Sequence, residues 1–125
     1  MQDRLDKYEQ TLLEGWEDIH KRGQLTLWIL LSLKQGPKHM NQIKEFIGRQ
    51  TNDSLQADDK SMYRALRRFD DAEMISHISQ PSKSGPDLKV YSLTDSGKQI
   101  TEAFIERNIS GIFYQPDVKK LIIDN

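Results

Sequence analysis

Residues 61–75 of the chain read SMYRALRRFDDAEMI. Placed on a helical wheel at about 100° per residue, this stretch separates into an apolar side and a basic side. The apolar side, which we expect to face a core, holds Met62, Ala65, Leu66 and Phe69. The basic side holds Lys60, Arg64 and Arg67, with Tyr63 and Arg68 flanking it. The pattern predicts a helix over residues 58–73, opened by two aspartates at the positive end of its dipole.

The basic side of this helix has the chemistry that phosphate oxygens and guanine edges require. Guanidinium groups bind both bidentately, and a tyrosine hydroxyl can donate to a phosphate. The competing interpretation is a solvated face whose arginines pair with Asp70 and Asp71. Such a pair is geometrically available, because Asp71 lies four residues after Arg67. An open basic patch would favour nucleic-acid binding, and a neutralised one would favour the solvated face.

Upstream of this stretch the sequence predicts three helices. Residues 2–21 form an amphipathic helix with a narrow apolar stripe, which is either a seam between subunits or a face lying on its own domain. The stripe consists of Leu5, Tyr8, Leu12, Trp16 and Ile19. Residues 24–35 are apolar nearly all round, which indicates a central buried helix ended by Gly36-Pro37. A short helix over residues 39–48 and a polar loop over 49–57 follow.

Downstream, two alternating runs at 74–79 and 88–94 predict a β-hairpin whose tip, QPSKSGPD, has turn composition. Lys83 and Lys89 flank this tip, where backbone or minor-groove contacts to DNA would fall, although Asp87 lies there too. Thr94 is expected to cap a fifth helix over 94–108, with Ile100 and Phe104 facing inward. Pro116 is expected to start a last short helix.

This order of elements is that of a winged helix-turn-helix, a mainly α fold with a small β-hairpin (α+β), here with an added N-terminal helix and short C-terminal helices. We divide the chain into a helix over 1–21 that could dimerise, a DNA-binding domain over 22–96 and C-terminal helices over 97–125 for dimerisation. The helix at 58–73 and the wing at 80–89 would then contact the DNA.

Three blocks of the sequence resemble the PadR family of transcriptional regulators. RGQLTLWILLSLKQGPKHMNQI, residues 22–43, is similar to the family's first helix running into a Gly-Pro turn. SMYRALRRFDDAEMI resembles its recognition helix, and SGPDLKVYSLTDSGKQI, residues 84–100, resembles its wing strand. The resemblance implies a homodimer that binds operator DNA, usually as a repressor. It places Ser61 at the opening of the recognition helix, Tyr63 at the motif tyrosine and Arg68 at the motif arginine.

The sequence departs from the family pattern at four places. His39-Met40-Asn41 replaces the usual His-Gly-Tyr, and Arg64 replaces a proline, which adds charge to the recognition helix. Glu73 stands where a glycine usually ends that helix. The basic run before the wing tyrosine is reduced to Asp87-Leu88-Lys89-Val90. Contacts to DNA are therefore expected from the helix more than from the wing.

Other functional classes fit the sequence less well. The three histidines lie on different predicted elements without metal-ligand spacing, and neither a nucleophile elbow nor a glycine-rich phosphate loop is present, so we expect no enzyme, metal or cofactor. Residues 1–20 are too charged for a signal peptide, and the longest apolar run is too short to span a bilayer. With no cysteine in the chain, a cytoplasmic protein without membrane contacts is expected.

Two alternatives remain open from the sequence. The net charge of −1 and the pI near 6.3 are compatible with a winged helix used only for protein–protein contacts. The aromatic side chains of Trp16 and Trp28 either lie at the dimer interface, where they could line a pocket for a small aromatic effector, or belong to the plain core.

Overall fold

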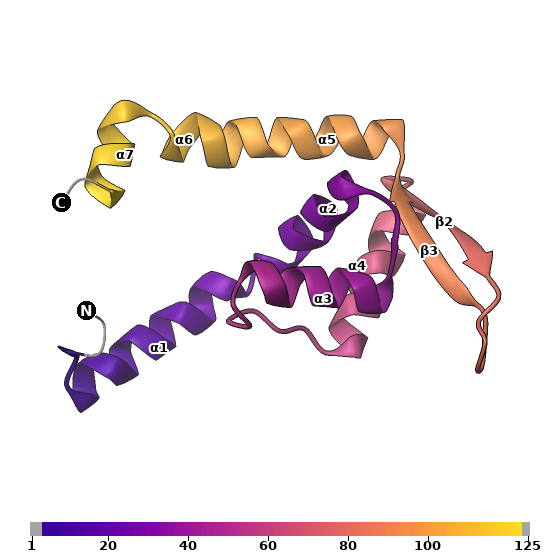
Figure 1. Cartoon of the computed structure of the whole chain (residues 1–125). Helices are drawn as coiled ribbons and strands as arrows, with labels where there is room; N and C mark the ends of the chain where they lie inside the picture. The colour runs from indigo at the N-terminus through magenta and orange to yellow at the C-terminus, as the bar shows by residue number, and fades with distance from the viewer. Residues whose placement is uncertain (1–3, 124–125) are drawn as a thin grey trace.

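The computed structural model describes residues 4–123, which form a central helical bundle, a small sheet and two helical arms (Figure 1). The bundle contains α2 (Leu25–Gln35), α3 (Met40–Gln50) and α4 (Asp59–Asp71). The antiparallel sheet has the strand order β1-β3-β2 and contains β1 (Lys38–His39), β2 (Ile75–Gln80) and β3 (Leu88–Leu93). This is the predicted mainly α winged helix-turn-helix with its β-hairpin.

The two arms extend from the bundle at its N-terminal and C-terminal ends (Figure 1). The first arm is α1 (Lys7–Lys21). The second consists of α5 (Asp95–Ile105), the π-helix η2 (Glu106–Ser110), α6 (Gly111–Phe113) and α7 (Pro116–Ile122). No helix among residues 4–123 is long and apolar enough to cross a membrane.

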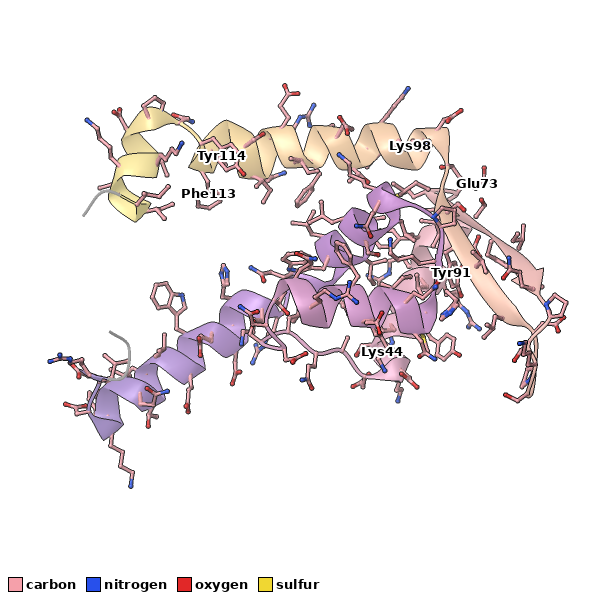
Figure 2. The ribbon with its side chains drawn as sticks, in the orientation of Figure 1. Lys44, Glu73, Tyr91, Lys98, Phe113 and Tyr114 are labelled. Atoms are coloured by element: carbon pink, nitrogen blue, oxygen red, sulfur yellow. The ribbon has the colours of Figure 1, made fainter. Side chains whose placement is uncertain are left out.

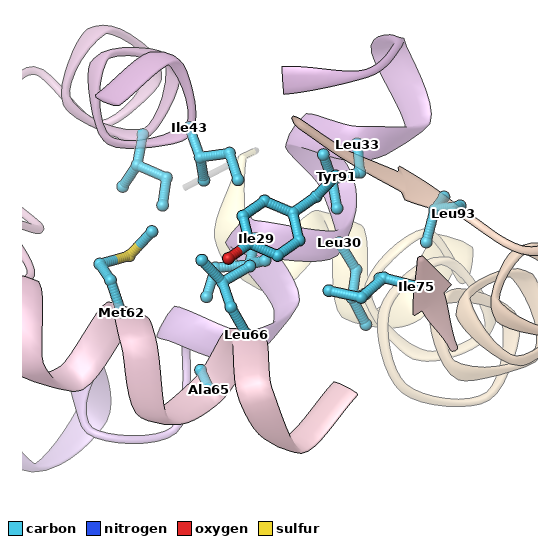
Figure 3. Close-up of a cluster of buried hydrophobic side chains, with 11 residues drawn as sticks. Ile29, Leu30, Leu33, Ile43, Met62, Ala65, Leu66, Ile75, Tyr91 and Leu93 are labelled. Carbon is cyan, nitrogen blue, oxygen red and sulfur yellow. The ribbon is translucent and has the colours of Figure 1, made fainter. Parts of the chain in front are cut away.

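The hydrophobic core lies where α2, α3 and α4 meet the sheet (Figure 3). α2 contributes three buried aliphatic side chains, which confirms it as the central helix. The predicted inward side of α4 is also confirmed, because Met62, Ala65 and Leu66 are buried and Phe69 packs against the core. The core comprises Ile29, Leu30, Leu33, Ile43, Ile47, Met62, Ala65, Leu66, Ile75, Tyr91 and Leu93.

The N-terminal helix is shorter than predicted. It begins at Lys7 rather than at residue 2, because Asp6 forms a capping box in which its Oδ1 accepts from the backbone N–H of Glu9 at 2.8 Å. Leu5 therefore precedes the helix, and Gln2 and Asp3 lie outside the described residues. α1 contains no buried residue, so its apolar stripe does not lie on its own domain.

The fifth helix differs from the prediction in two respects. α5 ends at Ile105 and continues as the π-helix η2, whereas one helix was expected as far as residue 108. The prediction that Ile100 and Phe104 face inward was wrong, since each is 47 % exposed. Helical spacing placed them correctly on one side of α5, but this side extends past the core and only Gly97 and Thr101 of the helix are buried.

The chain reverses between α4 and β2 at Glu73. This residue has φ of 62°, the left-handed conformation that glycine adopts without steric penalty. The reversal is completed by a hydrogen bond from the Met74 backbone N–H to the carbonyl of Phe69 at 3.0 Å. Glu73 thus fills a position that suits glycine, which gives a structural reason for the family's usual residue there.

Candidate nucleic-acid interface

Helix α4 begins with a side-chain cap that fixes the position of its first turn. Oδ1 of Asp58 accepts from the backbone N–H of Ser61 at 2.7 Å, which satisfies one of the free donors at the helix start. Hydrogen bonds from Ser61, followed by the charges of Arg64 and Lys60, hold the pKa of Asp58 below its ordinary value of 3.8. The carboxylate thus stays ionised beside a basic surface.

The basic side of α4 is open to solvent. Lys60, Arg64, Arg67 and Arg68 are exposed, as is Tyr63, while Ser61 is half-buried. Within residues 4–123 none of these cations makes an ion pair. In particular, Asp70 is bound by His77 instead of by an arginine, and Asp71 makes no ion pair with Arg67. The predicted alternative, a basic face neutralised by these aspartates, is not what the described residues form.

The hairpin of β2 and β3 extends beside α4 and ends in a loop over residues 81–87 (Figure 1). Its strands are paired from Ile75↔Leu93 to Gln80↔Leu88. Lys83 in the loop and Lys89 at the start of β3 are both exposed, as is Asp87. The wing therefore presents two cations and one acid, as its sequence indicates.

A side-chain contact that the sequence did not reveal joins α4 to the wing. Nδ1 of His77 on β2 lies 2.6 Å from Oδ2 of Asp70 on α4. The imidazole also contacts the ring of Tyr91 on β3, with centroids 5.8 Å apart. Burial, with smaller contributions from the charges of Tyr63 and Asp70, raises the pKa of Tyr91 above its ordinary value of 10.0. No spacing in the sequence indicates this contact, because the chain reversal at Glu73 brings His77 to Asp70 and the strand register brings it to Tyr91.

A surface hollow of about 290 Å³ lies between the start of α3, helix α4 and the wing. It brings together Tyr63 and Lys89, two residues that the sequence predicts to contact DNA. His39 and Asn41 also line the hollow, although the sequence did not predict that either residue contacts DNA. His39 caps α3, as its Nδ1 accepts from the Gln42 backbone N–H at 3.4 Å. It also pairs with Val90 through β1, a strand too short to be recognised in the sequence.

Arg68 lies apart from this hollow. It borders a different cavity, between α2, α4 and α5, together with Phe69, Met74 and Thr101. The residues predicted to contact DNA therefore do not all surround one hollow. Tyr63 on α4 and Lys89 on the wing border the first hollow, whereas Arg68 borders the cavity beside α5.

The residues predicted for dimerisation are largely exposed. Trp28 is half-buried against the core, as expected if it belonged to the core. The other five, on α1 and just before it, are all at least 36 % exposed, so Trp16 is no core residue. They are Leu5, Tyr8, Leu12, Trp16 and Ile19. On the opposite arm Phe113 and Tyr114 are similarly exposed (Figure 2).

A helical bundle with a strand-paired wing beside an open basic helix defines a winged helix-turn-helix protein of the kind that regulates transcription. The family model described as the transcriptional regulator PadR-like family matches residues 29–103, and the chain belongs to this family. No curated protein matches the chain significantly.

Three solved structures illustrate the similarity. Bacillus subtilis PadR in complex with operator DNA is 25 % identical with a TM-score of 0.59, over 65 % of this chain and 46 % of that one. This chain therefore spans less than half the length of that protein. A PadR-family regulator from Eggerthella lenta has a TM-score of 0.70 at 17 % identity, over 96 % of this chain and 100 % of that one. A PadR-like regulator from Bacillus cereus has a TM-score of 0.63 at 22 % identity, over 82 % and 94 %.

The last two similarities, below 25 % identity, establish the shared fold. The family, like the Eggerthella lenta and Bacillus cereus neighbours, is described as one of transcriptional regulators and not of enzymes.

Proposed function

We propose that the chain is a sequence-specific DNA-binding regulator that inserts α4 into the major groove of its operator and places the wing along the flanking backbone. The observation that carries this proposal is the open basic side of α4, on which no cation makes an ion pair among residues 4–123. Bacillus subtilis PadR, a protein of the same family, has been solved with operator DNA. A B-DNA major groove admits a helix of this kind.

We assign each side chain of the proposed DNA interface to base edges or to phosphates according to its position. Arg64 and Arg67 are exposed on the basic side of the helix, so we assign them to base edges or phosphates. The remaining residues of the interface would contact phosphates and fix the register on the duplex. They are Lys60, Ser61, Tyr63 and Arg68 on the helix, and Lys83 and Lys89 on the wing.

We further propose that the chain works as a homodimer. Both arms expose apolar side chains that a monomer leaves in water, including Trp16 on α1 and Phe104, Phe113 and Leu121 on the C-terminal arm. This supports the division into dimerising ends, residues 1–21 and 97–125, around a DNA-binding part over 22–96. A dimer would read an inverted repeat, since half-sites mirror the two-fold axis of the protein.

Three finer points belong to the same proposal. The family resemblance makes repression the expected direction of regulation, and a regulator that binds operators would work in the cytoplasm. Trp16 would lie in or near the subunit interface, where a small aromatic effector could stack on it or on Trp28. Dilution of the dimer should then change the tryptophan fluorescence, and a constant signal would place both side chains outside the interface.

The alternative function is a winged helix used for protein contacts without DNA. The observation that favours it is the net charge of −1, because many small DNA-binding domains are basic. The two functions differ in their salt dependence, since phosphate contacts release counterions and protein contacts do so far less.

The deciding experiment is fluorescence anisotropy with a labelled fragment from upstream of the chain's own gene and a random fragment of equal length, at two salt concentrations. Preference for the upstream fragment that weakens with salt is the expected result. Weak, equal binding to both fragments would argue against autoregulation. An absence of binding to either at low salt would reject the DNA-binding proposal in favour of protein contacts.

A further inference from the structure

The imidazole of His77 joins the inner face of the wing to helix α4. Alternate residues of a strand point to the same face of the sheet, and Ile75, on the same face as His77, is buried in the core. His77 is therefore the first position on this face of β2 at which the hairpin leaves the core. There its Nδ1 lies 2.6 Å from Oδ2 of Asp70, and Tyr91 is its partner on β3.

This contact is the one side-chain hydrogen bond between α4 and the hairpin of β2 and β3 within residues 4–123. β2 is the edge strand of the sheet and pairs with β3, whose Val90 and Tyr91 pair in turn with β1. Strand pairing thus fixes β2 to the sheet, whereas the contact with Asp70 fixes it to the helix. The orientation of the wing relative to α4 depends on both.

The strength of the contact depends on the charge of the imidazole. A neutral imidazole with its hydrogen on Nδ1 donates an ordinary hydrogen bond to the carboxylate. An imidazolium donates a charge-assisted bond, which is roughly twice as strong, and is also attracted to an aromatic ring within about 6 Å. The ring centroids of His77 and Tyr91 are 5.8 Å apart. Histidine is the side chain whose charge ordinarily changes between about pH 5 and 8, so this contact can respond to pH.

The other charged and titratable groups on this side of the wing come from α4 and β3, since β2 carries none besides His77. Asp70 is the one acid among them and is in direct contact with the imidazole, whereas the cations are exposed, so that water and salt screen their charge. The groups are Asp70, Tyr63 and Arg67 on one side of α4, and Tyr91 and Lys89 on one face of β3.

We propose that Asp70 and His77 are a positioning pair for operator binding, and that protonation of His77 controls how firmly the wing is held beside α4. With an imidazolium the helix and the hairpin meet the operator in one fixed arrangement. With a neutral imidazole the hairpin is held less firmly, and ordering it on the DNA uses part of the binding free energy. Operator affinity therefore rises as the pH falls. The effect on the operator rests on the proposed function, whereas the effect on the wing does not.

The first test is fluorescence anisotropy of the full-length protein with the labelled upstream fragment at about pH 6 and about pH 8, at one ionic strength. The affinity should be about two- to fivefold higher at the lower pH, the range open to a partly exposed ion pair. His77→Gln keeps a hydrogen-bond donor that cannot change its charge, and it should lose this increase. His39→Gln is the matched control and should keep it, because His39 lines the hollow beside the wing but lies outside the pair.

Asp70→Asn separates positioning from simple charge. Loss of an acid near phosphates tightens DNA binding through charge alone, but loss of the pair should abolish the increase at low pH. Asp71→Asn makes the same change of charge at a residue without an ion pair in the described part of the chain, and it should keep the increase. If Asp70→Asn also kept it, the imidazolium would act only as one more charge near the DNA, and the positioning role would be overturned. Equal pH responses in the parent and His77→Gln would overturn it too.

A measurement without DNA keeps this pair and the proposed function apart. Amide protection factors, which correct for the intrinsic effect of pH on exchange, are compared between β2 and α2. Relative to α2, those of β2 should be about two- to fivefold higher at the lower pH in the parent and equal at both in Asp70→Asn. This result in a protein that binds no DNA would support the pair and reject the proposed function. Protection that does not change with pH would overturn the pair, whatever the DNA measurement shows.

Discussion

Asp70 near the end of α4 and His77 on β2 are joined by a 2.6 Å contact between carboxylate Oδ2 and imidazole Nδ1. The two side chains are 30 % and 33 % exposed, so solvent screens the contact only in part. The contact links the helix proposed to enter the major groove to the hairpin proposed to contact the flanking backbone. The angle between the two therefore depends on a side-chain pair as well as on the chain reversal at Glu73.

We expect His77→Ala to loosen the wing without unfolding the bundle. The loss in stability should be about 1 kcal/mol or less, because the pair is partly exposed. Amide hydrogen exchange in β2 should become faster while the core amides of α2 stay protected. Ser76→Ala, at the neighbouring exposed position, is the control. Unchanged exchange in the His77 variant would show that strand pairing alone holds the wing.

Arg64→Ala and Arg67→Ala should each weaken operator binding by about 1–3 kcal/mol if the guanidinium contacts a base. An arginine that contacts only phosphate should instead weaken binding to all sequences alike and lower the salt slope by about one. Arg22→Ala, in the exposed link between α1 and α2, is the control for lost positive charge. Unaltered operator affinity in both α4 variants would remove this helix from the interface.

Gly97 is required by a close approach of two backbones. A Cβ at this position would lie 1.8 Å from the carbonyl oxygen of Met74, which also accepts hydrogen bonds from Thr94 and so has little freedom to move. Gly97→Ala should therefore destabilise the fold by about 1–3 kcal/mol or more, measured by chemical denaturation.

The matched control for this substitution is Gly15→Ala in the exposed helix α1, where an added Cβ meets nothing within 4 Å. It should stabilise that helix by about 0.5–1 kcal/mol. If the two variants had similar stability, the close approach at Met74 would not be the reason for glycine.

Glu73→Gly should stabilise the protein, because an L residue in the left-handed region is strained by roughly 1–2 kcal/mol and glycine is not. The added freedom of glycine in the unfolded chain offsets part of this gain, so we expect about 1 kcal/mol at most. Glu73→Gln keeps the backbone strain and removes the charge. It should leave the denaturation midpoint nearly unchanged, and an equal gain in both variants would assign the effect to charge.

Acid should weaken the contact between the C-terminal arm and the bundle. The hydrogen bond from Lys34 Nζ at 2.7 Å, and then its charge, hold the pKa of Glu102 below the ordinary value of 4.5. The folded chain therefore binds fewer protons at Glu102 than the unfolded chain between these two values. The contribution to stability is complete above about pH 4.5 and is lost as the pH falls through the folded-state pKa.

Glu102→Gln removes this titration, so the stability of the variant should fall less steeply with acid than that of the parent chain. Urea denaturation across this pH range measures the difference. Asp58, whose pKa is also lowered, titrates in both proteins and leaves a shared slope. Parallel curves for the two proteins would show that the Lys34 contact does not form in solution.

The features that the sequence predicts well are those carried by local patterns. The helical wheel of α4 places Met62 and Leu66 inward, as the structure does. Asp58 at the start of α4 and Pro116 at the start of α7 are residue types that suit the first positions of a helix. β1 escaped detection because two residues cannot show an alternating pattern. Ile100 and Phe104 were misplaced because periodicity identifies the apolar side of a helix but not whether anything covers it.

The candidate site follows the same division. Exposure of Arg64 and Arg67 could be predicted from their helical positions, whereas their lack of acidic partners could not. Asp70, three residues after Arg67, instead contacts His77, which the chain reversal at Glu73 brings next to the end of α4. The buried hydroxyl of Thr101, which finds no hydrogen-bond partner within residues 4–123, is likewise not predictable from the sequence, because threonine on a helix usually finds a backbone acceptor.

The strained backbone at Glu73 also has an evolutionary meaning. Any glutamate codon becomes a glycine codon through a single base change, so one mutation is enough to produce Glu73→Gly and remove this backbone strain. A lineage that altered Arg64 or Arg67 to recognise a new operator, at some expense of folding stability, could recover it at position 73. A substitution at this turn could then offset the loss of stability caused by substitutions in α4. The turn lies just beyond the helix proposed to read the DNA and outside the surface proposed to touch it.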